Sequence, residues 1–251
     1  MPIPHIKSAL ITGGAKRIGA AIAVDLATRG YDVGIHCHQS RRDADDLAAR
    51  LAHTGQKIAV ISADLSNANS IDPLFDQARA AIGPIGVLIN NAALFERDDL
   101  NHIDPDMFHR HMQINCLAPM LLTHAMAAQN APDTNVINII DHSIFKNPVG
   151  YTSYTLSKSA LWSATQMAAK YYYGRMRINA IAPGIILPAI DAPQSAHWRD
   201  GFTPSPLPHD ENIDDIVHVV RYILDNPAIH GQLIPVDSGR HISPQPILSQ
   251  S

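Results

Sequence analysis

Several features that mark other classes of protein are scarce or missing in this sequence. Only 2 of its 251 residues are cysteines, Cys37 and Cys116, which excludes a disulfide framework and fits a reducing cytoplasm. No apolar run approaches the roughly 18–20 residues that cross a bilayer, and no basic amphipathic stretch indicates a membrane surface. The first residues lack the basic-then-apolar order of a signal peptide. We therefore expect a soluble cytoplasmic protein.

An excess of positive charge is also lacking. The chain has 19 Lys and Arg against 23 Asp and Glu, a net charge of -4, so we expect no nucleic-acid partner. Its 14 histidines raise the question of a metal site. However, HExxH and CxxC patterns are missing, and His109 and His111 would face apart on a helix. We expect no bound metal.

What the sequence does contain is a repeated alternation of apolar strand-length runs and longer amphipathic stretches. This alternation predicts an α/β fold, a doubly wound parallel sheet with helices on both faces. No linker interrupts it, so we expect one domain over residues 1–251, in which the irregular segment 185–210 forms a substrate loop. The expected strands are 8–12, 32–38, 57–65, 86–94, 135–143, 175–184 and 232–236, and the expected helices are 17–30, 41–55, 69–82, 105–130, 154–173 and 212–225.

The stretch "TGGAKRIG" at residues 12–19 joins the first strand to the first helix. Gly13 and Gly19 would allow tight backbone geometry, and the helix N-terminus would attract a pyrophosphate. The spacing is not that of G-x-G-x-x-G, and Arg17 stands where the familiar turn has glycine. By itself the match is therefore a weak signal, and a plain strand-to-helix turn is the alternative.

The end of the second strand points to the cofactor. An NAD site places an acid there to bind the ribose hydroxyls, but this segment has no acid before Asp43. His38, Gln39 and Ser40 offer groups that would bind a 2′-phosphate, which favours NADP(H). Arg41 and Arg42 could contribute, or they could be solvated residues at a helix start.

In "YTLSK", Tyr154 and Lys158 are four residues apart and would share one helix face. A tyrosine pKa near 10 is too high for efficient proton transfer at neutral pH, and a nearby ammonium lowers it. The preceding strand would bring Asp141 to the carboxyl edge of the sheet, where open α/β folds bind ligands.

These motifs, together with "ADL" (63–65), "NNAA" (90–93), "MQINCLAP" (112–119) and "APG" (182–184), resemble the short-chain dehydrogenase/reductase family. The resemblance implies a Rossmann-like domain of about seven strands, a homotetramer, and hydride transfer from a nicotinamide. It implies that Tyr154 donates the proton, Lys158 binds the nicotinamide ribose and Asn115 holds a relay water. The cofactor-binding residues it implies are Gly13, Arg17, Ile18, Gly19, His38, Gln39, Ser40, Asp64, Leu65, Asn91, Ala92, Tyr154, Lys158, Pro183 and Gly184.

Two departures from the family pattern are similar to its pteridine reductase branch. Asp141 occupies the place where the family usually has serine, and Arg17 occupies a glycine position. The resemblance extends to Phe95, which would stack on a pterin, and to Tyr151 on the substrate side. The substrate-binding residues expected from it are Arg17, Phe95, Asp141, Tyr151 and Tyr154.

The chemistry of a pterin suits these replacements. A flat heteroaromatic ring fits an aromatic platform, and a carboxylate accepts hydrogen bonds from pterin N–H groups. Arg17 could bridge the cofactor phosphates and the pterin, or add only a pyrophosphate contact. We expect an NADPH-dependent reductase of dihydropterins that could also act on dihydrofolate. The alternatives are a carbonyl reductase for 3-oxoacyl thioesters or sugars, and a non-catalytic NADP(H)-sensing protein.

Overall fold

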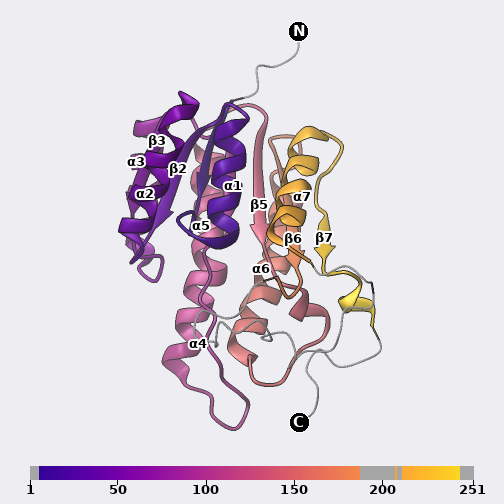
Figure 1. Cartoon of the computed structure of the whole chain (residues 1–251). Helices are drawn as coiled ribbons and strands as arrows, with labels where there is room; N and C mark the ends of the chain where they lie inside the picture. The colour runs from indigo at the N-terminus through magenta and orange to yellow at the C-terminus, as the bar shows by residue number, and fades with distance from the viewer. Residues whose placement is uncertain (1–5, 187–206, 208–210, 244–251) are drawn as a thin grey trace.

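The computed structural model of the chain describes residues 6–186, 207 and 211–243, so most of the expected substrate loop lies outside it. Seven parallel strands form one sheet in the order β3-β2-β1-β4-β5-β6-β7 (Figure 1), which confirms the predicted fold class. The strands are β1 (Ser8–Ile11), β2 (Asp32–Cys37), β3 (Ile58–Ser62), β4 (Val87–Asn90), β5 (Thr134–Ile139), β6 (Met176–Pro183) and β7 (Leu233–Val236).

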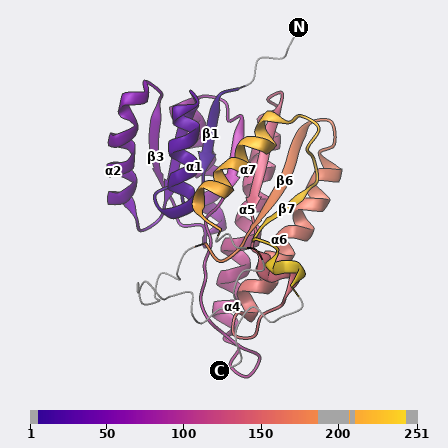
Figure 2. The same ribbon diagram turned by 45° about the vertical axis from the view of Figure 1, so that its right-hand side comes forward.

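Helices cover both faces of this sheet. One face carries α1, α2 and α7, and the other carries α3, α5 and α6. Figure 2 shows α1 and α7, which contact each other, lying together over the first face. The helices are α1 (Arg17–Thr28), α2 (Arg41–Leu51), α3 (Ile71–Ile82), α4 (Pro105–Met112), α5 (Ala118–Ala128), α6 (Thr152–Tyr171) and α7 (Ile213–Asp225), and short helical turns are η1 (Ala52–Thr54), η2 (Ala68–Ser70), η4 (His142–Phe145) and η5 (Arg240–Ile242).

The strands are apolar throughout because both faces of the sheet are buried. In β1, Ala9 and Ile11 pack in the cluster that contains α1, α2 and α7, whereas Leu10 packs in the cluster on the opposite face. All three side chains are fully buried. A strand covered by helices on both sides has no solvent-exposed face, so its apolar residues do not alternate with polar ones. This explains the continuous apolar runs of the sequence.

The long helical region expected over roughly 105–130 is present, but it is not regular throughout. The structure breaks it into α4, a π-helical turn η3 (Gln113–Leu117) and α5. Pro119 supplies the physical reason, because it has no N–H to donate to the carbonyl of Asn115 four residues earlier. Insertions of this kind are frequent at functional sites.

The carboxyl ends of the strands meet at one edge of the sheet, and α4 extends beyond that edge (Figure 1). The glycine turn, η4 and the N-terminus of α6 follow strand ends and therefore lie along it. Among the helices of the described residues, none is long and apolar enough to span a bilayer.

Candidate active site

The glycine turn is tightly held against the end of β4. Gly13 adopts φ +59°, and a methyl group on Gly19 would overlap the Gly13 carbonyl oxygen and approach Asn91 Nδ2 to 2.6 Å. Asn91 Nδ2 donates to the carbonyls of Thr12 (2.9 Å) and Gly13 (3.0 Å). The backbone N–H groups of Asn91 and Ala92 donate to Thr12 Oγ1, both at 3.0 Å. Two predicted cofactor segments are thus joined directly.

His36 of β2, which was not predicted as a site residue, supports this turn from the other side. The Gly13 N–H donates to His36 Nδ1 at 3.2 Å, and His36 Nε2–H donates to the Ala63 carbonyl at 3.1 Å. Burial lowers the pKa of His36 to about 4, so its ring is neutral at physiological pH. A histidine within a buried strand run was the only signal for this role in the sequence.

Helix α1 presents its N-terminus to the turn without a side-chain cap. Lys16 occupies the N-cap position and makes no capping bond, and the first turn, which holds Ile18 and Gly19, contains no acid. The Lys16 ammonium instead pairs with Asp43 at 2.9 Å. Uncapped N–H groups at the positive end of a helix form a site for an anion.

Arg17 has a left-handed backbone, with φ +55°. This conformation is easy for glycine and costs a residue with a Cβ about 1–2 kcal/mol. Arg17 thus keeps the backbone conformation that suits glycine, although it carries a side chain. Strain of this kind persists where the side chain has a use, which supports a role for the guanidinium.

The predicted phosphate-binding segment lies open at the end of β2. His38 and Gln39 are exposed and Ser40 is half-buried, just before α2. His38 Nδ1 is 4.0 Å from Asp64 Oδ1, and Ser66 hydrogen bonds hold the pKa of Asp64 below its ordinary value. Arg41, by contrast, is paired with Asp45 on its own helix at 2.9 Å. Leu65, which follows Asp64 in the sequence, is buried.

Asp141, Tyr154 and Lys158 come together at the ends of β5 and α6. The Tyr154 hydroxyl donates to Asp141 Oδ2 at 2.9 Å. Lys158 Nζ donates to the Ile139 carbonyl at 2.7 Å and lies 5.8 Å from the Tyr154 ring centroid. Both Tyr154 and Lys158 are buried, and burial lowers the pKa of Lys158 to about 8.

The pKa of Tyr154 is not lowered in the structure, in contrast to the expectation from the nearby Lys158 ammonium. Burial, followed by the Asp141 charge and its hydrogen bond, raises the pKa of Tyr154 well above 10. The Asp141 carboxylate lies in direct contact with the Tyr154 hydroxyl, and its charge favours the protonated form. Tyr154 therefore stays protonated, as a proton donor must be before reaction.

Asn115 lies on the π-helical turn and is fully buried. Its amide group donates to the Leu94 carbonyl at 2.9 Å and to Ser157 Oγ at 3.0 Å, and its Oδ1 accepts from the Leu94 N–H at 2.8 Å. The side chain thus ties the loop after β4 to α6.

Phe95 and Tyr151 form an aromatic stack beside Tyr154. The Phe95 and Tyr151 rings lie 4.6 Å apart and 8° from parallel, and Phe95 meets Tyr154 edge to face at 4.6 Å. Asp98, which was not predicted, holds this loop in place because it accepts hydrogen bonds from Ser153 N (3.0 and 3.2 Å) and Oγ at the start of α6. Phe95 remains 43% exposed and so offers an apolar surface.

Pro183 and Gly184 end β6 on the same edge. The Gly184 N–H donates to the Val236 carbonyl at 2.8 Å, and a Cβ there would come within 2.7 Å of Asp237 Cα. The close approach leaves no room for a side chain. Within the described residues no three His, Cys, Asp or Glu side chains gather as a metal site would require.

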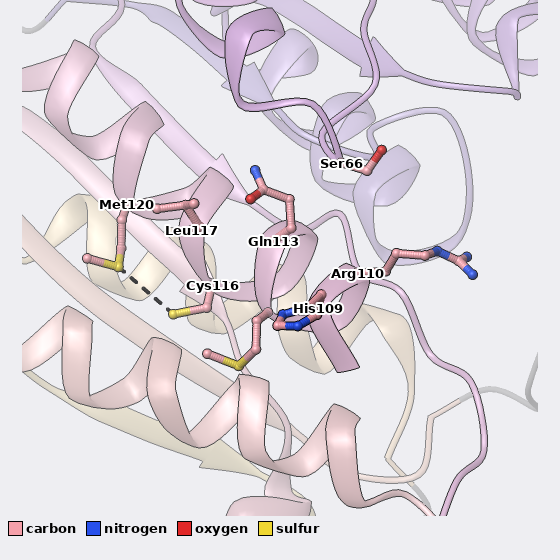
Figure 3. A pocket seen from close by; sticks show the side chains of 8 residues that line it. Ser66, His109, Arg110, Gln113, Cys116, Leu117 and Met120 are labelled. Carbon is pink, nitrogen blue, oxygen red and sulfur yellow. Dashed lines mark hydrogen bonds between the residues drawn. The ribbon is translucent and has the colours of Figure 1, made fainter. Parts of the chain in front are cut away.

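A cavity of about 560 Å³ lies apart from these residues, on the outer side of α4, η3 and α5 (Figure 3). Cys116 and Met120 line it, with their sulfurs 3.9 Å apart, and Ser66 closes it from the turn after β3. Its lining includes none of the catalytic side chains predicted from the sequence.

Comparison with known proteins agrees with this geometry. A family model described as short chain dehydrogenase matches residues 7–198. Pteridine reductase 1 of Leishmania tarentolae is 30% identical over 94% of this chain and 96% of its own. The structure of FolM alternative dihydrofolate reductase 1 from Brucella canis, complexed with NADP, matches with a TM-score of 0.90 at 36% identity over 96% of this chain and 97% of its own. Its Brucella suis counterpart, also in complex with NADP, gives 0.89 at 37% identity over 95% and 96%.

The family match covers both the glycine turn and the Tyr154–Lys158 pair, and the similar proteins include a pteridine reductase. The resemblance inferred from the motifs is therefore confirmed. The chain belongs to the short-chain dehydrogenase family of oxidoreductases, in its pteridine reductase-like branch.

Proposed function

We propose that the protein uses NADPH to reduce a dihydropterin, such as dihydrobiopterin or dihydromonapterin, to the tetrahydropterin, with dihydrofolate as a candidate second substrate. The observation that carries the proposal is the contact between Asp141 and Tyr154 at 2.9 Å beside the Phe95 ring. A carboxylate, a proton donor and an aromatic surface on one site match the hydrogen-bonding groups and the flat shape of a pterin.

The residues at the sheet edge fit an NADP(H) molecule. The crowded space at Gly19 and the uncapped N-terminus of α1 suit a pyrophosphate, and the acid-free segment after β2 suits a 2′-phosphate. The similar Brucella structures contain NADP. The residues proposed to hold the cofactor are Gly13, Arg17, Ile18, Gly19, His38, Gln39, Ser40, Asp64, Leu65, Asn91, Ala92, Tyr154, Lys158, Pro183 and Gly184.

When bound, the reduced nicotinamide supplies the hydride to a carbon of the pterin. Tyr154 gives its hydroxyl proton to the adjacent ring nitrogen, so that a C=N bond becomes CH–NH. The raised pKa of Tyr154 keeps that proton in place until reaction, and Asp141 Oδ2 fixes the direction of the hydroxyl. Lys158, whose pKa burial lowers to about 8, holds the nicotinamide ribose and returns a proton through the water near Asn115.

The substrate lies against Phe95 in this proposal. Tyr151 backs the Phe95 ring in parallel contact at 4.6 Å, so the platform is rigid before a pterin arrives. Asp141 accepts a hydrogen bond from a pterin N–H, and Arg17 reaches the pterin across the cofactor phosphates. A preorganised platform reduces the entropy lost when the substrate binds.

Two other functions remain as alternatives. A reductase of 3-oxoacyl thioesters or sugars would share the Tyr154–Lys158 pair, but a carboxylate at Asp141 disfavours a carbonyl oxygen that needs a hydrogen-bond donor. A non-catalytic NADP(H)-sensing protein would not need the contact between Asp141 and Tyr154, because cofactor binding alone requires no proton donor.

The test is the loss of NADPH absorbance with dihydrobiopterin, dihydromonapterin, dihydrofolate and an acetoacetyl thioester in parallel. We expect rapid turnover of a pterin, little turnover of the thioester, and a preference for NADPH over NADH. In Asp141→Ser, pterin reduction should fall much more than NADPH affinity. Turnover of the thioester alone would establish the carbonyl reductase, and cofactor binding without turnover would establish the sensor.

We also propose that the protein is a cytoplasmic homotetramer. Leu117, Met120, Leu156 and Met167 expose apolar side chains on η3, α5 and α6, where a second copy of the chain could cover them. Both cysteines are unbonded, which fits a reducing compartment. Light scattering of the purified protein should give four times the chain mass, and Met167→Glu should reduce the assembly.

A further inference from the structure

His142, the residue that follows Asp141, is buried at the start of η4 and has no assigned role in the reaction. Its Nδ1 lies 3.3 Å from Asp141 Oδ1 and 3.1 Å from the Pro183 carbonyl oxygen. The ring therefore bridges the carboxyl ends of β5 and β6. Those two ends carry the proposed substrate carboxylate and the proposed nicotinamide turn.

The surroundings fix the tautomer of this ring. A carbonyl oxygen and a carboxylate oxygen both accept hydrogen bonds, so the nitrogen between them must carry the hydrogen. Nδ1–H is thus required whether the ring is neutral or charged. Nε2 is buried and makes no hydrogen bond within the described part of the chain, so Nδ1 is the atom through which His142 acts.

The two oxygens of Asp141 have separate partners as a result. Oδ1 receives the Ser143 N–H at 2.7 Å and lies beside His142 Nδ1, whereas Oδ2 receives the Tyr154 hydroxyl. A carboxylate held at Oδ1 from two directions cannot rotate about its Cβ–Cγ bond. Oδ2 therefore stays directed at Tyr154.

The charged groups around His142 come from several elements. Asp141 precedes it, Asp237 after β7 acts on it electrostatically, and Asp237 is itself bound by His241 of η5 at 2.8 Å. On the far side of Asp141 lie Tyr154 and Lys158 of α6.

These groups set the protonation of the pair. Burial lowers the pKa of His142, but contact with Asp141 and the charges of both carboxylates outweigh it and raise the pKa overall. Burial also raises the pKa of Asp141, and His142 and Ser143 reverse that effect, so the pKa of Asp141 ends below its ordinary value. Asp141 is consequently a carboxylate at neutral pH.

We propose that His142 is a positioning residue, whose Nδ1–H holds Asp141 as an oriented carboxylate and ties it to the Pro183 turn of the cofactor site. The proposal rests on the proposed pterin reduction for its catalytic consequence. Its structural content, the orientation and ionisation of Asp141, can be measured without turnover.

Two substitutions separate the hydrogen bond from the bulk of the ring. His142→Asn keeps an N–H at the distance from the backbone where Nδ1 lies, and His142→Gln moves it one bond further, to the place of Nε2. We expect His142→Gln to lower kcat for dihydrobiopterin about tenfold or more, as loss of a bond to a charged group does, and His142→Asn to keep most of the activity. NADPH affinity should change little in either.

The readout that packing alone would not change is the titration of Asp141. Its carboxyl stretch can be followed by infrared difference spectroscopy in the substrate-free protein, with Asp141→Asn as the spectral reference. We expect protonation at higher pH in His142→Gln than in the wild type, with a matching shift of the acidic limb of kcat/KM, and a near-normal titration in His142→Asn.

Equal losses in the two variants, with an unchanged Asp141 titration, would overturn the proposal and leave His142 as a packing residue. If the wild type reduces no pterin, the proposed function fails, but the titration still decides whether His142 controls Asp141. If His142→Gln does not fold, His142→Asn is compared with the wild type instead. A changed titration of Asp141 in His142→Asn would then count against the proposal.

Discussion

Arg17 offers the sharpest test of why the glycine turn gave up a glycine. Its φ of +55° is in the left-handed region, yet it opens α1 at the proposed pyrophosphate site. Two substitutions, Arg17→Ala and Arg17→Gly, both remove the guanidinium and its contacts. They differ only in the Cβ, so their difference isolates the backbone term from everything the side chain does.

The magnitude follows from two opposing effects. A Cβ in the left-handed region costs about 1–2 kcal/mol, whereas glycine loses about 0.5–1 kcal/mol more conformational entropy on folding than alanine. At the middle of these two ranges, Arg17→Gly should therefore be more stable than Arg17→Ala by about 0.75 kcal/mol. For a domain of this size, that difference corresponds to a Tm about 1–4 °C higher.

Function should respond differently from stability. If the guanidinium bonds the cofactor phosphates and the pterin, both variants should lose about 10- to 100-fold in kcat/KM for dihydrobiopterin, because each loses the same charged hydrogen bonds. Thermal unfolding and steady-state NADPH oxidation measure the two properties on the same preparations. Equal Tm values would refute the backbone argument, and full activity in Arg17→Gly would refute the role of the guanidinium.

Three further predictions concern the same edge of the sheet. Tyr154→Phe should lower turnover by about 10²–10⁴-fold while NADPH binding, followed by fluorescence, is retained, since only the proton donor is lost; unchanged turnover would remove Tyr154 from the mechanism. Gly19→Ala should abolish tight NADPH binding because its methyl would overlap the turn. Gly55→Ala is the control, because Gly55 has φ +75° but no atom lies within 4 Å of the added methyl. This variant should lose stability and keep its NADPH affinity. Equal NADPH affinities in Gly19→Ala and Gly55→Ala would contradict the steric argument. The pKa of His36 is lowered to about 4, so its neutral ring contributes stability that is complete above pH 6.5 and is lost as pH falls toward 4. Denaturant unfolding at several pH values should show a smaller loss in His36→Gln than in the wild type over that window; identical curves would show that this titration does not govern acid stability.

The strands and the helices were predictable because their signals are local, whereas the order of the strands comes from the structure. Continuous apolar runs such as "VLIN" predict a strand buried on both faces, and that is where β4 lies. Tyr154 and Lys158 were found because four residues of helix bring them onto one face. The π-helical turn was not predicted, because the sequence indicated only a long helical region there, although the missing N–H of Pro119 is visible in the sequence.

The supporting residues of the site could not be predicted in the same way. His36 contacts Gly13 across 23 positions, Asp98 contacts Ser153 across 55, and His142 contacts Pro183 across 41. Each contact joins two strand ends or loops whose approach depends on the folded sheet. The predicted direction of the Tyr154 pKa shift was wrong for the same reason, because the tertiary structure brings the Asp141 carboxylate into contact with Tyr154.

The order of the strands explains why these contacts gather where they do. Strands β1, β2 and β3 follow one another toward one edge of the sheet, and strands β4 to β7 follow one another toward the opposite edge. The connections after β1 and β4 therefore run in opposite directions. Open α/β sheets bind ligands at the carboxyl ends of two such strands, where the strand order reverses. Gly13 after β1 and Asn91 after β4 meet at that place. A cofactor lying across it would have its phosphates on the β1–β2 side and its nicotinamide toward Lys158 on the β5–β6 side. In the proposed function, the pterin then lies beside Asp141 and Phe95, so an acid and an aromatic ring at that place would determine the choice of substrate.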